Sequence, residues 1–156
     1  TGATSVVGTN GATWLITGVQ LEVGQNPTEF EHEPFERTLA KCHRYYWKHG
    51  ASEENELFYR YGSHGESISS SQAQSMTHFP QRMRAHPSLT VTDDVDWYSN
   101  GSIVNTTGSF SVDGNGGGTY ATTVVNSNLS GLTSGRAGVF ISNNNTDSNM
   151  EWDAEL

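Results

Sequence analysis

The sequence predicts an all-β protein: an antiparallel, jelly-roll-like β-sandwich that follows a short strand and a connecting helix. Short candidate strands succeed one another through the second half of the chain, and turn signals such as the glycine-rich run 113–118 separate them. Composition agrees: hydrophobic residues make up 33% of the chain and charged residues 16%, while six Phe, six Tyr and four Trp argue against disorder. Because so little apolar surface is available, we expect the core to be completed across subunits.

The first predicted element is a strand over residues 14–23. Every second residue from Leu15 to Val23 is apolar or Thr, and Gln20 and Glu22 fall on the opposite face. This period of two is typical of a strand with one apolar face, and the Gly- and Pro-containing run 24–27 ends it.

The second predicted element is a helix over residues 34–48, with Pro34 in its first turn and Gly50 after its end. Its apolar stripe has helical spacing and consists of Phe35, Leu39, Cys42 and Tyr46. We expect Cys42 to be buried on this stripe as a small hydrophobic residue. It is the only cysteine in the sequence, which excludes an intramolecular disulfide.

Short strands are predicted for the rest of the chain, and the polar stretch 67–75 is either a loop or a weak strand. The strand candidates are 57–61, 88–92, 101–106, 109–112, 118–125, 136–141 and 149–156. The predicted organisation is therefore the last strand of a preceding β-module (1–30), a connecting helix (31–50) and a C-terminal β-sandwich (51–156). The opening residues do not resemble a natural start, so we expect a C-terminal piece of a longer protein.

Charge narrows the partners that this chain can have. The net charge is −9 and the pI is near 4.9, which disfavours nucleic acid and anionic membrane surfaces because both require a basic face. No apolar run is long enough for a transmembrane helix, so we expect no membrane insertion.

No catalytic, metal-binding or cofactor-binding pattern is present in the sequence. The acidic run Asp93–Asp96 does not match the EF-hand spacing, and the six histidines form no zinc motif. The serines at 67–71 lack a nucleophile-elbow pattern, and the glycine-rich run 113–118 lacks the Lys-Ser/Thr ending of a phosphate loop. We therefore predict neither catalysis nor a cofactor.

Aromatic residues beside turns are the best candidates for ligand binding. Trp97 and Tyr98, flanked by Asp96 and Asn100, combine rings that stack on sugar C–H faces with polar groups that bind hydroxyls, and Tyr120 is a further candidate. The alternative is that these rings belong to the core or to a subunit interface, where aromatic residues are common.

Three segments, in order, resemble a pattern found in viral structural proteins. They are Gly18-Val-Gln-Leu-Glu-Val-Gly24 with Thr28-Glu-Phe-Glu31 and Leu39-Ala-Lys-Cys-His-Arg-Tyr-Tyr-Trp-Lys48, then Phe79-Pro-Gln-Arg-Met-Arg-Ala-His-Pro-Ser-Leu-Thr-Val-Thr92, then Trp152-Asp-Ala-Glu-Leu156. The chain resembles the C-terminal region of tail-fibre and tailspike proteins of bacteriophages. It departs from that pattern at Ser88, which stands in place of the usual Thr, and at Leu89, which is an added residue.

The resemblance implies a homotrimer on the virion surface, in which the strand ending at Val23 closes a preceding jelly-roll-like module. The helix would be a connector near the three-fold axis, with Phe35, Leu39 and Tyr46 at the subunit interface, and the sandwich would form the fibre tip. The expected function is trimer assembly and attachment to a receptor on the host cell. The receptor expected first is a cell-surface glycan. Two alternatives remain: a structural virion module without ligand, such as a head decoration or a fibre-folding cap, and a fragment of a carbohydrate-active enzyme.

Overall fold

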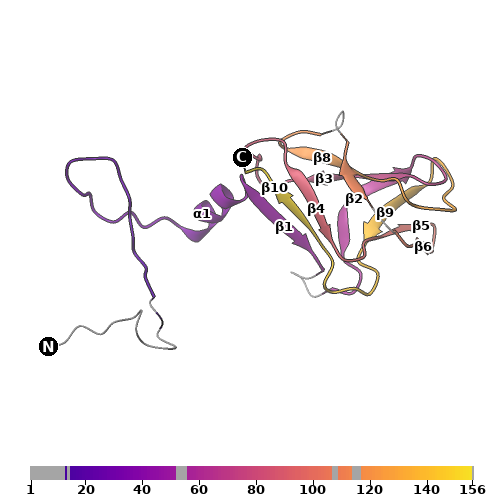
Figure 1. Ribbon diagram of the computed structural model, residues 1–156, viewed down its shortest axis with the longest axis horizontal. Coiled ribbons are helices and arrows are strands. Elements are labelled where there is room, and N and C mark those ends of the chain that lie inside the picture. The colour runs from indigo at the N-terminus through magenta and orange to yellow at the C-terminus, as the bar shows by residue number, and fades with distance from the viewer. Residues whose placement is uncertain (1–12, 14, 52–55, 107–108, 114–116, 156) are drawn as a thin grey trace. The chain divides into compact units, whose positions relative to one another are not determined.

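The computed structural model describes residues 13, 15–51, 56–106, 109–113 and 117–155, shown in Figure 1. The chain divides into two units, residues 1–34 and residues 35–156, which are described separately below. Within the described residues, helix and strands occur only in the second unit, which contains one helix and ten strands.

The described part of the first unit is an irregular segment, so the strand predicted over 14–23 is not formed there. Gly18 adopts a left-handed conformation with φ of 66°, which interrupts the extended backbone. Polar side chains of the segment find hydrogen-bond partners within it: the Glu22 carboxylate accepts hydrogen bonds from the Thr28 backbone N–H at 2.5 Å and from the Thr28 hydroxyl at 2.6 Å. The apolar side chains of the segment are not covered by other residues of the chain: Leu21 and Val23 are fully exposed.

Helix α1 (Phe35–Cys42) follows Pro34 but is shorter than predicted, because residues 46–50 form a strand instead. The alternation within that strand points Trp47 and His49 inward, and its pairing with a neighbouring strand outweighs the helical spacing of the sequence. None of the residues of α1 is buried. Cys42 is exposed, which contradicts the prediction that it packs as a buried hydrophobic residue.

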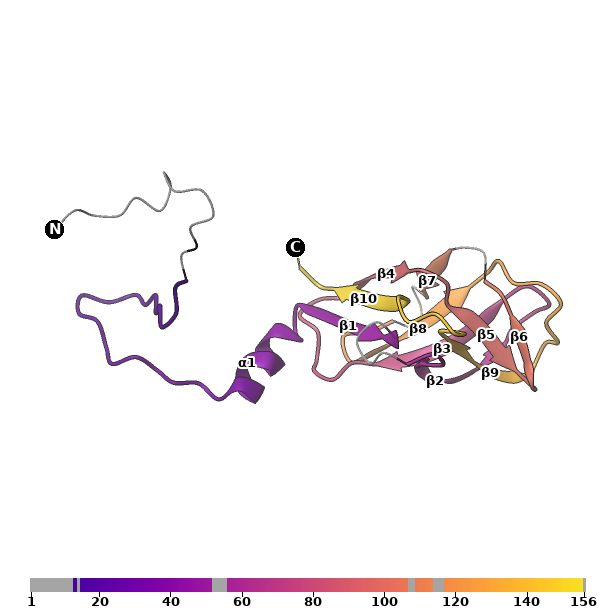
Figure 2. The ribbon, with the colours of Figure 1, turned by 90° about the horizontal axis from the view of Figure 1, so that it is seen from below.

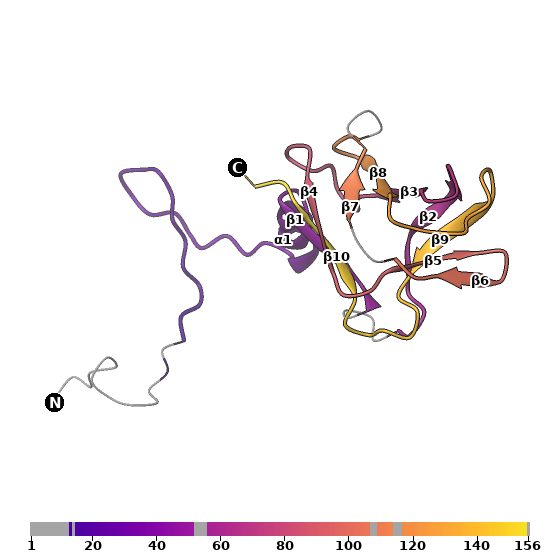
Figure 3. The same ribbon diagram turned by 45° about the vertical axis from the view of Figure 1, so that its right-hand side comes forward.

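Two antiparallel sheets face each other in the second unit, as Figures 1 and 2 show, and this arrangement confirms the predicted sandwich. The small sheet has the order β1-β10-β4 and is formed by β1 (Tyr46–Gly50), β10 (Asn149–Asp153) and β4 (Ser88–Thr92). The large sheet has the order β6-β5-β9-β2-β3-β8-β7. It is formed by β2 (Arg60–Ser67), β3 (Ala73–His78), β5 (Asp96–Ser99), β6 (Ser102–Val104), β7 (Phe110–Val112), β8 (Ala121–Asn126) and β9 (Ala137–Ile141). It curls, so that β5 and β6 lie at the end farthest from the small sheet (Figure 3).

Large rings on the facing sides of the two sheets form the core. Trp97, Phe140 and Tyr61 occupy one row across β5, β9 and β2, and all three are completely buried. Trp152 of the small sheet is equally buried. Gly138 lies directly beneath the Trp97 indole, and an added Cβ there would overlap the ring. The close approach of β9 to Trp97 therefore depends on the absence of a side chain at this position.

His49 lies within this core between aromatic rings. Its imidazole stacks on Trp47 with the ring centroids 4.1 Å apart, and its Nε2 accepts a hydrogen bond from Trp152 Nε1–H at 3.3 Å. Its Nδ1 lies 3.4 Å from the Tyr59 hydroxyl. Burial lowers the pKa of His49 to about 4, so the ring is neutral and both of its nitrogens face a hydrogen-bonding group.

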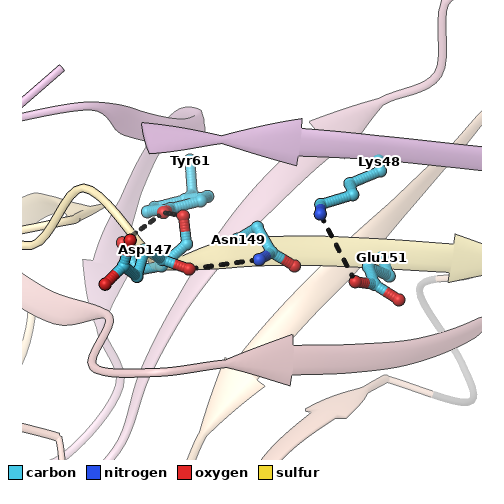
Figure 4. A network of polar contacts seen from close by, with 6 residues as sticks. Lys48, Tyr61, Asp147, Asn149 and Glu151 are labelled. Atoms are coloured by element: carbon cyan, nitrogen blue, oxygen red, sulfur yellow. Dashed lines mark hydrogen bonds and ion pairs between the residues drawn. The ribbon is translucent and has the colours of Figure 1, made fainter. Parts of the chain in front are cut away.

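Further polar contacts lie at the start of β10 and beside it, as Figure 4 shows. The Tyr61 hydroxyl donates to the Ser148 carbonyl oxygen at 2.7 Å, and burial raises the pKa of Tyr61. Asn149 Nδ2 donates to the carbonyl oxygen of Asp147 at 3.2 Å. On the outer side of the small sheet, Lys48 and Glu151 form an ion pair at 3.9 Å, which contributes little because both side chains are partly solvated.

Candidate functional site

A hollow of about 190 Å³ opens on the outer face of the large sheet. It is lined by Phe58, Arg60, Tyr98, Ile103 and Ile141. These residues come from β2 and the segment before it, and from β5, β6 and β9, so four neighbouring strands contribute to one surface.

Strand register brings these side chains together. Arg60 is opposite Ile141 across the β2–β9 pair, and Tyr98 is opposite Ile103 across the β5–β6 pair. Successive side chains of a strand point to opposite faces, and Trp97 points into the core. Tyr98 must therefore point outward, toward the hollow.

The hollow has exposed walls and a buried floor. Phe58, Ile103 and Tyr98 are 57%, 40% and 37% exposed, whereas Ile141 is only 5% exposed. Arg60 is exposed at the same site and brings a planar group with five N–H donors. The arrangement offers two rings for stacking and one cation for hydrogen bonding, beside an apolar surface.

Asp96 was predicted to bind a ligand, but the structure gives it a different role. It is 3% exposed and accepts hydrogen bonds from the Thr106 backbone N–H at 2.9 Å and from Asn143 Nδ2 at 2.6 Å. These bonds tie the segment after β6 and the β9–β10 connection to β5. Both carboxylate oxygens are engaged within the protein, where Asp96 positions the hairpin next to the hollow.

Trp97 was also predicted to bind a ligand, but the structure places its ring in the core. Its ring is completely buried and packs edge-on against Phe140 with the centroids 4.8 Å apart. The alternative interpretation from the sequence, that such a ring belongs to the core, is the correct one for Trp97.

Asn100 and Tyr120 lie away from the outer-face hollow. Asn100 is exposed in the turn between β5 and β6, with φ of 51°. It lines a different hollow, whose lining also includes Ser67 and Arg136. Tyr120 is 65% exposed just before β8, where Arg82 lies over its ring at 5.1 Å. Since β9, β2 and β3 separate β5 from β8, the structure does not bring Tyr120 to Tyr98.

Phe58 and Arg60 were missed as site residues. The sequence signal was present, because residues 57–61 were predicted as a strand and Phe58 and Arg60 alternate with the inward-facing Tyr61. The sequence does not reveal the strand order, in which only β9 lies between this strand and β5.

The residues predicted for a subunit interface are accessible in the single chain. Phe35 and Leu39 on α1 are 75% and 38% exposed, and Tyr46 at the start of β1 is 42% exposed. Their contact with other subunits stays a prediction.

A larger hollow, about 410 Å³, lies elsewhere, beside β4 and β7, and it contains none of the predicted ligand residues. Asp93 and Asp94 line it, but no group of three or more His, Cys, Asp or Glu side chains able to hold a metal ion occurs among the described residues. Likewise, no helix in the described part of the chain is long and apolar enough to cross a membrane.

Comparisons of the chain with protein-family models, with curated proteins and with solved structures found no significant match.

Proposed function

We propose that this chain is the C-terminal part of a bacteriophage tail fibre or tailspike, where it assembles as a homotrimer and attaches the virion to a glycan on the host-cell surface. The outer-face hollow that contains Tyr98 carries the attachment proposal, because it joins two exposed rings and a cation on a rigid sheet. The three ordered sequence segments that resemble such fibres support the virion assignment.

Sugar recognition would use the two kinds of chemistry that the hollow supplies. Tyr98 and Phe58 stack on the C–H faces of a sugar ring, and the Arg60 guanidinium donates hydrogen bonds to its oxygens. A shallow hollow of about 190 Å³ gives weak binding at each site. Three sites on one fibre, repeated over several fibres, raise the overall affinity without any new contact.

The motif that begins the resemblance also forms a bonded unit in this chain. Gln20 Oε1 accepts a hydrogen bond from the Glu31 backbone N–H at 2.8 Å, and Glu22 holds Thr28 as described above. The polar residues of the run 18–24 and those of the run 28–31 are thus each other's partners. This pairing supports the view that the two runs act together as one connecting structure.

A glycan array followed by titration of the best hit tests the attachment proposal. The variants Tyr98→Ala and Phe58→Ala are expected to weaken binding at least about tenfold each, equivalent to about 1.4 kcal/mol. Tyr120→Ala is the matched control, since it removes an exposed Tyr ring that lies four strands away, and it should bind normally. An array without hits would replace the attachment proposal with the structural module that lacks a ligand. A hit whose affinity is unchanged in both hollow variants would show that the glycan binds elsewhere than in this hollow.

A further inference from the structure

A second, smaller hollow lies on the opposite face of the β5–β6 hairpin. Its volume is about 110 Å³, and its polar lining includes Ser67, Ser99, Asn100, Ser102, Thr133 and Arg136. Ser99 and Ser102 are opposite each other in the hairpin. Ser99 lies two residues after the inward-facing Trp97, so its side chain points to the same face of the sheet. The hollow is therefore on the inward-facing side of the β5–β6 hairpin. Figure 3 shows that this hairpin lies at the end of the large sheet farthest from the small sheet.

The walls of this hollow are held in place by hydrogen bonds. The backbone N–H groups of Leu132 and Gly135 donate to the carbonyl oxygens of Ser70 and Ser67 at 3.1 and 2.7 Å. The Ser134 hydroxyl donates to the Ile68 carbonyl oxygen at 2.8 Å. The loop between β8 and β9 is thereby fixed on the β2–β3 turn, and a rigid wall of this kind presents its side chains without a large cost in ordering.

Ser67 indicates that the hollow takes a polar ligand. It is 1% exposed, and its Oγ has no hydrogen-bond partner among the described residues. Ser67 is one of several buried hydroxyls without a partner in the described core, and each such group calls for an explanation because its burial is destabilising. Ser67 also lines the hollow, so a rotation of its side chain would bring the hydroxyl to a ligand oxygen seated there.

The charge of the lining indicates an anion. Arg136 lines the hollow, and none of the described lining residues is acidic. This stands out in a chain with 17 Asp and Glu against 8 Lys and Arg. Around Arg136, the Asn100 amide and the hydroxyls of Ser102 and Thr133 supply further hydrogen-bond donors.

We propose that this concave hollow binds the carboxylate group of an acidic sugar, with Arg136 as its charge partner and Ser67 as a buried donor. The volume corresponds to roughly three to four waters, which suits a carboxylate and its nearest atoms but not an oligosaccharide. A guanidinium matches a carboxylate in geometry as well as in charge. The choice of a sugar rests on the proposed function, but the site does not rest on the outer-face hollow, because the two share no lining residue.

The test is a two-dimensional NMR titration of the full chain with glucuronate, with glucose as the neutral counterpart and with inorganic sulfate. Glucuronate should shift the amide signals of Ser67, of residues 99–102 and of residues 131–136, and glucose should not. Equal or tighter binding of sulfate would overturn the acidic-sugar assignment in favour of a simple inorganic-anion site. Absence of shifts at these amides with glucuronate would overturn the proposal altogether.

Variants then separate this site from the outer-face hollow. Arg136→Gln should weaken glucuronate binding at least tenfold, and Ser67→Ala should weaken it several-fold. Arg60→Gln is the matched control, since it removes an exposed arginine from the outer-face hollow, and it should leave glucuronate binding unchanged. Equal loss in Arg60→Gln and Arg136→Gln, or full binding by Arg136→Gln, would contradict the assignment, whatever the glycan array shows for Tyr98.

Discussion

At the residue scale, burial decides what each polar or aromatic side chain does in this fold. Trp97 and Tyr98 are neighbours in the chain, yet one is completely buried and the other is 37% exposed, because β5 alternates between core and surface. Asp96 can be buried because two hydrogen-bond donors compensate for the hydration that its carboxylate loses. One of them, Asn143, is 47 residues away in the chain, so the role of Asp96 could not be read from the local sequence.

His49 makes the stability of the sandwich depend on pH. The folded protein holds the His49 pKa at about 4, below the ordinary value of 6.5, so protons bind more tightly to the unfolded chain. The contribution of the neutral ring is complete above pH 6.5 and is lost as the pH falls from 6.5 to about 4. We expect a total loss of roughly 3 kcal/mol over this range, measured as the free energy of unfolding in urea.

A variant without this titration isolates the effect of His49. His49→Phe should unfold more easily at pH 7.5, because the bond from Trp152 is lost, but its stability should change less between pH 6.5 and 5. His64→Gln removes an exposed histidine and should keep the pH dependence of the parent chain. The same slope in His49→Phe as in the parent would show that His49 is not the titrating group.

Gly138 is a position where one added methyl group should disturb the aromatic core. A Cβ there would overlap the Trp97 ring and lie 2.7 Å from the Tyr98 carbonyl oxygen, so either the ring or the backbone must move. We expect Gly138→Ala to destabilise by about 1–3 kcal/mol and to lower the thermal midpoint by several degrees. Gly24→Ala is the control, since its added Cβ would meet only the Asn26 carbonyl oxygen at 3.6 Å. Equal midpoints for the two variants would contradict the close packing inferred for Gly138.

At the element scale, strands with clear alternation or turn boundaries were predictable, and elements fixed by distant pairing were not. The predicted strand 88–92 coincides with β4, and the prediction of 136–141 differs from β9 by one residue. β5 was missed because its Asp-rich approach is typical of a turn. The helical spacing that continues to Tyr46 was outweighed by the pairing of β1 with β10, which no local pattern reveals. For the same reason Tyr98 was predicted as a site residue and its partners in the hollow were not.

Helix α1 is the element that most needs a neighbour. It has eight residues, none of them buried, and isolated helices of this length are marginal in water. We therefore expect Leu39→Asp to lower the assembly state from trimer to monomer, measured by light scattering. Ile103→Asp makes the same change at a similarly exposed position on β6 and should leave the mass unchanged. A Leu39→Asp chain that stays fully trimeric would remove α1 from the interface.

At the scale of the whole molecule, the proposed trimer should account for the bare apolar face of the first unit. The mass of the assembly should be about 51 kDa, three times the 17.0 kDa of one chain. In the described single chain, residues 15–23 pair with no other strand, so their amides should exchange rapidly in a dilute monomer. In the trimer we expect slow exchange at Val19, Leu21 and Val23, measured by hydrogen–deuterium exchange. Rapid exchange in a sample of trimeric mass would show that other subunits do not cover this face.

The short strands at the two ends of the large sheet have a consequence for crowding. β6 and β7 are each three residues long, so a neighbouring chain can form very few backbone hydrogen bonds with either edge. Long, flat edges are the templates on which sheet proteins aggregate, and these edges are too short to serve as such templates. Many copies of this domain can therefore be displayed at high local density while each keeps its large sheet closed to the next.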